Sequence, residues 1–171
     1  MKTSKTVRRL TVCAALSALG VVFLYIAAVM PTSRLGISAI AGLMPGVAVL
    51  VYGRVSGWTV YGITAVLALL LVPMRSVSVL YLLFLGHWPM VKSLLEKIPQ
   101  GWLSFLAKLA VFNILLTVTI FLFSTLFFDL SGKEYATWLI YIIGNIAFIA
   151  YDFAFSLLVA GFGKRIREML K

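Results

Sequence analysis

The stretch Leu10–Met30, with the sequence LTVCAALSALGVVFLYIAAVM, decides the fold class of this chain. None of its residues is charged, and nearly all of them are apolar. An α-helix needs about 20 mostly apolar residues to cross the hydrocarbon core of a bilayer, because each residue advances the helix by about 1.5 Å. The run is also longer than the apolar core of a typical signal peptide, which has about 7–15 residues. It therefore predicts a retained membrane-spanning helix.

The composition of the whole chain agrees with this interpretation. Of its 171 residues, 63% are apolar and 12% are charged, and the mean hydropathy is +1.09. A soluble domain of this size buries only about 70% of its unfolded surface, so it could not hide so many apolar side chains. The composition excludes an ordinary soluble enzyme, a disordered chain and a disulfide scaffold. The single cysteine, Cys13, cannot form a disulfide within the chain.

Further apolar blocks predict five more spans. Those at 58–72 and 77–91 are short, about 15 residues or 22 Å each. Short spans of this kind either extend into their flanks, lie where the bilayer is thinned or form a re-entrant pair. Of these alternatives, we favour two full spans. The chain is thus predicted to be an all-α bundle of six transmembrane helices, forming one domain over residues 1–171. The five blocks are Leu35–Gly53, Trp58–Val72, Val77–Val91, Trp102–Phe128 and Thr137–Gly163.

The basic residues orient the bundle. With both termini in the cytoplasm, eleven of the fifteen Lys and Arg residues lie on the inner side, three lie outside and Lys108 lies within the fifth span. This asymmetry follows the positive-inside rule. The net charge of +10 is then expected to meet anionic lipid at the inner face rather than nucleic acid. The three outer residues are Arg34, Arg75 and Lys133.

Polar side chains inside the spans are the candidates for function, because an ionisable group in hydrocarbon usually faces a cavity or a partner. Asn145 and Asp152 are seven residues apart and share one face of the sixth helix, which Tyr141 and Trp138 extend outward. Asn113 on the fifth helix lies at about the same depth as Asp152, roughly 16 Å from the inner end.

Two interpretations of these residues stay open. Asn113 and Asp152 could hydrogen-bond and Lys108 could reach Asp152, which would make an interhelical clasp. The amide and aromatic groups could instead line a substrate pocket in the outer half of the bundle. For the pocket, Ser78 and Tyr81 on the fourth helix would supply the opposite wall.

No catalytic motif is found. His87 has no nearby carboxylate or cysteine to complete a metal site, and the chain lacks both a phosphate-binding glycine loop with a lysine and a serine in a nucleophile-type glycine motif. We therefore expect a protein that is not an enzyme and has no cofactor or metal. The small residues Ala14 and Ala18 are four apart on the first helix, as are Gly42 and Gly46 on the second, and such spacing lets another helix approach closely.

The segment Arg9–Gly20, RLTVCAALSALG, and the turn Gly53–Gly57, GRVSG, resemble the substrate-binding S components of energy-coupling factor (ECF) vitamin transporters. The length, six spans and inside termini are similar as well. The resemblance implies a prokaryotic plasma-membrane subunit that captures a vitamin or related micronutrient in its outer half. It also implies that Ala14 and Ala18 dock on a transmembrane coupling subunit driven by two ATPases, and that Arg34 lies on a lid loop.

Two other classes of function remain open. One is a scaffold membrane protein that resembles the small rod-shape-determining subunit of cell-wall machinery and binds partner helices through its small-residue faces. The other is an ion-coupled or lipid-handling protein that uses Asp152 as a relay. The predicted substrate-binding residues are Arg34, Ser78, Tyr81, Asn113, Trp138, Tyr141, Asn145 and Asp152.

Overall fold

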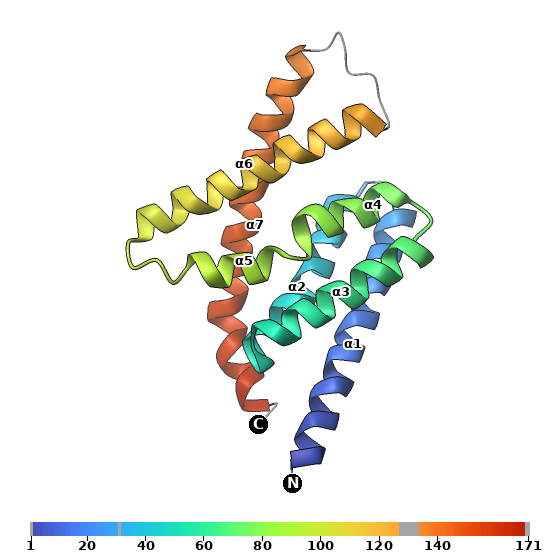
Figure 1. Cartoon of the computed structure of the whole chain (residues 1–171), viewed down its shortest axis with the longest axis vertical. Helices are drawn as coiled ribbons and strands as arrows, with labels where there is room; N and C mark the ends of the chain where they lie inside the picture. The colour runs from blue at the N-terminus through green and yellow to red at the C-terminus, as the bar shows by residue number, and fades with distance from the viewer. Residues whose placement is uncertain (1, 31, 127–133, 170–171) are drawn as a thin grey trace. The chain divides into compact units, whose positions relative to one another are not determined.

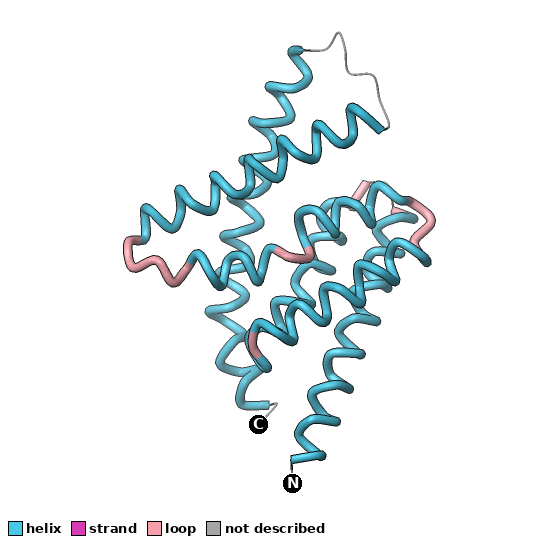
Figure 2. Tube along the Cα trace, viewed as in Figure 1, coloured by secondary structure: helices cyan, strands magenta, loops and turns pink. Residues whose placement is uncertain are grey.

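The computed structural model describes residues 2–30, 32–126 and 134–169, and within these ranges it contains helices and no strand (Figure 1, Figure 2). A short π-helix, η1, interrupts the fourth apolar segment. Lys133 lies outside the described residues. The elements are α1 (Lys2–Val29), α2 (Arg34–Tyr52), α3 (Arg54–Leu71), α4 (Arg75–Leu80), η1 (Tyr81–Leu85), α5 (Trp88–Leu95), α6 (Gly101–Leu126) and α7 (Glu134–Met169).

The described part of the chain has six helical segments that are long and apolar enough to cross a membrane. The prediction of an all-α protein with six such helices is confirmed. The third and fourth spans, Arg54–Leu71 and Arg75–Leu95, have 18 and 21 residues. Both extend into the flanks of the apolar blocks that predict them. At about 1.5 Å per residue they reach about 27 and 31 Å, close to the thickness of a bilayer core.

The chain divides into two compact units, and each is described by itself. Unit 1 comprises residues 1–93 and 158–171, and unit 2 comprises residues 94–157. Unit 1 therefore holds α1 to η1, most of α5 and the end of α7. Unit 2 holds α6 and the greater part of α7.

The core of unit 1 lies where α1, α2 and α3 pack side by side (Figure 2). Alanine fills much of this core because its small side chain lets helix backbones approach closely. A second small cluster contains Cys13, which is buried and forms no disulfide. The main cluster consists of Leu24, Ala27, Ala41, Ala65, Ala68, Val72, Val77 and Tyr81.

The two small-residue pairs noted in the sequence are used differently. Gly42 and Gly46 are buried inside unit 1, so their close approach serves internal packing. Ala14 and Ala18 are exposed, whereas Ser17 on the neighbouring strip of α1 is buried. The small face of α1 is therefore left open by unit 1.

The π-helix changes the register of the fourth span. The N–H of Gly86 donates to the carbonyl of Tyr81, five residues earlier, at 2.8 Å. A wider turn of this kind releases carbonyl groups from the α-helical pattern. The carbonyl of Leu82 accepts a hydrogen bond from the Tyr61 hydroxyl of α3 at 2.9 Å. This bond ties the interruption to the core of unit 1.

Candidate functional site

The polar residues of α6 and α7 meet in pairs within unit 2. The side-chain amides of Asn113 and Asn145 exchange two hydrogen bonds, at 2.9 and 3.0 Å. One turn further along each helix, the hydroxyls of Thr117 and Tyr141 lie 2.7 Å apart. Because the helices are antiparallel, each step of four residues along α6 is matched by a step of four back along α7. We call these contacts and the ion pairs of Lys108, which are described next, the polar ladder.

Lys108 forms the ionic end of the polar ladder. Its ammonium donates to Glu96 Oε1 at 3.0 Å and to Asp152 Oδ2 at 3.3 Å. The side chains of Lys108 and Asp152 are only 10% and 15% exposed, whereas that of Glu96 is 48% exposed. Two carboxylates therefore flank one buried cation. Each buried charge has an opposite charge within hydrogen-bonding distance, as low-dielectric surroundings require.

Of the two contacts that the clasp interpretation offers, the one between Lys108 and Asp152 is present. Asn113 bonds to Asn145, not to Asp152. The rings of Phe112 and Phe148 on the same two helices are stacked, with centroids 4.2 Å apart. The register that stacks these rings aligns Asn113 with Asn145, and the long side chain of Lys108 then reaches Asp152.

A double-mutant cycle measures what the amide pair contributes. Asn113→Ala, Asn145→Ala and the double variant should show a coupling of about 0.6 kcal/mol, and not more than about 1.7 kcal/mol, as between other membrane helices. The measurement is unfolding of the full chain in dodecyl maltoside by added dodecyl sulfate. Ile142→Ala, which removes an exposed apolar side chain of α7, is the control for truncation alone. A coupling near zero would show that the amides do not hold α6 and α7 together.

The predicted site residues of unit 1 face its interior. Ser78 is buried and its hydroxyl donates to the carbonyl of Ala68 at 2.9 Å. Tyr81 is fully buried at the first position of η1. Arg34 begins α2 and is half-buried, and its Nε atom is buried without a hydrogen-bond partner.

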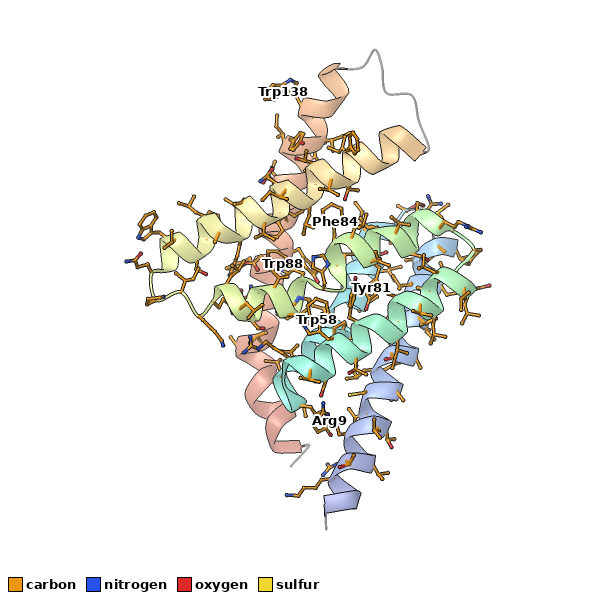
Figure 3. The ribbon with its side chains drawn as sticks, in the orientation of Figure 1. Arg9, Trp58, Tyr81, Phe84, Trp88 and Trp138 are labelled. Atoms are coloured by element: carbon orange, nitrogen blue, oxygen red, sulfur yellow. The ribbon has the colours of Figure 1, made fainter. Side chains whose placement is uncertain are left out.

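An aromatic cluster in unit 1 includes the first residue of the π-helix, Tyr81, which is labelled with Trp58 in Figure 3. The ring centroid of Tyr61 lies 5.6 Å from that of Trp58 and 6.1 Å from those of Tyr81 and His87. The sequence indicated neither this cluster nor the π-helix, because the residues come from two spans. From the sequence, regular α-helical spacing is assumed along the fourth span, and this assumption cannot reveal the wider turn of the π-helix.

Trp138 differs from the other predicted residues because it is 74% exposed (Figure 3). An exposed tryptophan near the end of an apolar span is typical of an anchor in the membrane interface. Glu96 was missed as a partner of Lys108. It follows α5 in a turn, and helical periodicity does not extend across a turn. The eight predicted residues thus comprise three in unit 1 and five in unit 2.

The chain was compared with other proteins in three ways. No protein-family model matches it, and neither curated proteins nor solved structures give a match. The arguments for function therefore rest on the residues and their contacts.

Proposed function

We propose that this chain is the substrate-capture subunit of an ATP-driven importer in a prokaryotic plasma membrane. In this proposal it takes up a vitamin or a related micronutrient, with both termini in the cytoplasm. It docks through α1 on a transmembrane coupling subunit that works with two ATPase subunits. The chain itself performs no catalytic step.

The exposed small face of α1 is the observation that supports this proposal. Ala14 and Ala18 lie one turn apart and are exposed, while Cys13 and Ser17 on the adjoining strip are buried. Small residues on a lipid-facing surface leave little side chain for lipid to contact. They allow a second helix to approach the backbone, with contacts over a large area. The comparable pair on α2, Gly42 and Gly46, is buried inside unit 1 and is not available to a partner helix.

The docking face is tested by making it bulky. Ala14→Trp and Ala18→Trp should abolish uptake because the indole rings hold the partner helix away. The tagged chain is purified from its own organism, the co-purifying solute is identified by mass spectrometry, and uptake of that solute is measured. Both variants should still retain the solute. Leu19→Trp, on the exposed side of α1 but about 100° around the helix from Ala18, is the matched control and should transport normally. Normal uptake by both alanine variants would contradict the proposal.

A second candidate is a scaffold membrane protein, and the polar ladder favours it. Its hydrogen bonds join Asn113 with Asn145 and Thr117 with Tyr141. Polar residues paired in this way hold two helices together. A scaffold retains no solute on purification. The mass-spectrometric measurement therefore separates the two candidates.

A further inference from the structure

Three helices of unit 1 begin with an arginine and have no acidic residue in the first turn: α2 at Arg34, α3 at Arg54 and α4 at Arg75. The N-terminal end of a helix carries a partial positive charge, so a cation there is unfavourable unless an anion compensates it. The first 93 residues contain no Asp or Glu at all. Within this stretch, the arginines have no carboxylate with which to pair.

Of these three helices, α2 begins with the arginine that has a buried polar atom without a partner. The Nε atom of Arg34 is buried and has no hydrogen-bond partner. The N-cap residue, Ser33, makes no side-chain bond to the first turn. The Ser33 carbonyl accepts the N–H of Ile37 at 3.0 Å. The N-terminus of a helix is suited to bind an anion, because its N–H groups point outward and this end carries partial positive charge.

Ser38 adds an independent observation. It lies four residues after Arg34, on the same face of α2, and it is fully buried. Its hydroxyl has no hydrogen-bond partner, whereas the buried hydroxyls of Ser17 and Ser78 both donate to carbonyl groups. Side chains in an α-helix tilt toward the N-terminus, which directs the Ser38 hydroxyl toward the turn that Arg34 begins. A buried polar group without a partner is rare and indicates a missing ligand or water.

We propose that the N-terminal turn of α2 binds an anionic oxygen group, a carboxylate or a phosphate. The Arg34 guanidinium and the Ser38 hydroxyl hold it beside the positively charged end of the helix. Both of these groups donate hydrogen bonds, and an anion accepts them while compensating both Arg34 and the helix end.

The inference rests on the proposed function, because it assigns the anion to the captured solute. In the proposed orientation α2 begins on the outer side, where a solute enters. A lipid headgroup offers the same phosphate chemistry at this depth. The experiment therefore supplies the two sources separately.

The full chain is purified in dodecyl maltoside, whose sugar headgroup carries no phosphate, and its melting temperature is followed by tryptophan fluorescence. Inorganic phosphate and acetate are titrated at constant ionic strength. A second series adds phosphatidylglycerol to the micelles, with monoacylglycerol as its uncharged counterpart. Free phosphate at about 100 times its Kd should raise the melting temperature of the wild-type chain by about 5–10 °C.

The variants locate the site. Arg34→Gln should weaken phosphate binding by about tenfold or more, and Arg34→Lys, which keeps the charge but not the Nε–H, by less. Ser38→Ala should weaken it by about threefold to tenfold. The matched controls are Arg54→Gln and Ser56→Ala at the start of α3, where Ser56 donates to the Tyr52 carbonyl. Both controls should bind as the wild type does. If Arg34→Gln does not fold, Arg34→Lys and Ser38→Ala still test the site.

A rise in melting temperature with phosphate or acetate that these Arg34 and Ser38 variants reduce supports the inference. A rise with phosphatidylglycerol alone keeps the anion site and overturns its assignment to the solute. No rise with any anion, or an equal rise in the wild type and the folded variants, overturns the site. If a neutral solute co-purifies and its uptake depends on Ala14 and Ala18, the assignment of the anion to the captured solute fails while the proposed function stands. An anion-dependent rise in melting temperature without any solute uptake would support the anion site and contradict the proposed function.

Discussion

Replacement of Lys108 with methionine should destabilise unit 2 by about 1.5–3 kcal/mol, the usual contribution of a hydrogen bond between charged groups. The ammonium is the shared partner of Glu96 and Asp152, and the Asp152 side chain is only 15% exposed. Methionine has a similar length and fills the space, so the loss is electrostatic rather than steric. It removes the ion pairs that Lys108 makes with Asp152 and Glu96. Dodecyl sulfate unfolding of the full chain in dodecyl maltoside measures the change.

Two further variants separate this effect from loss of packing. Glu96→Gln should cost about 1 kcal/mol or less, because Glu96 is about half exposed and solvent screens its charge. The double variant Lys108→Met with Asp152→Leu removes both buried charges and should recover most of the lost stability. A Lys108→Met chain as stable as the wild type would show that the ionic end of the polar ladder contributes nothing.

Replacement of Gly86 with alanine should destabilise unit 1 by about 1–3 kcal/mol. An added Cβ would lie 2.6 Å from a ring carbon of Tyr61 and 2.7 Å from one of Tyr81. Neither ring can move easily. Tyr81 is fully buried, and the Tyr61 hydroxyl is bonded to the Leu82 carbonyl. The cost therefore comes from overpacking at the end of the π-helix, and the same unfolding measurement detects it.

Gly62→Ala is the matched control on α3. Nothing lies within 4 Å of an added Cβ at Gly62. Alanine has the higher helix propensity, so this change should stabilise the chain by about 0.5–1 kcal/mol. Equal effects of the two substitutions would contradict the close packing of Tyr61 and Tyr81 around Gly86.

The polar residues of α6 and α7 show how much of the candidate site can be predicted from spacing along a helix. The face shared by Tyr141, Asn145 and Asp152 could be derived from the sequence because helical geometry alone determines it. Their partners could not be derived in full. The reach of Lys108 to Asp152 follows from the similar depth of the two residues, but a shift of one turn between the helices changes the partner of Asn113. That register depends on how Phe112 and Phe148 stack.

The candidate anion site shows the same limit in unit 1. Arg34 and Ser38 are four residues apart in the sequence, and this spacing places them on one face of α2. The absence of acidic residues from the first 93 residues is also visible in the sequence. That the Ser38 hydroxyl and Arg34 Nε are buried without partners depends on the helices packed around them. Burial of an individual atom is a property of packing and not of periodicity.

The sequence alone determined that this chain is helical and has six segments able to span a membrane. Runs of about 20 apolar residues suffice for that conclusion, because backbone groups in hydrocarbon must be satisfied within each helix. Only the tertiary structure decided which small residues stay exposed, where the π-helix interrupts the fourth span and which polar groups pair. These features arise from contacts between helices. Such contacts depend on side-chain shape and register across distant parts of the chain, which hydropathy does not encode.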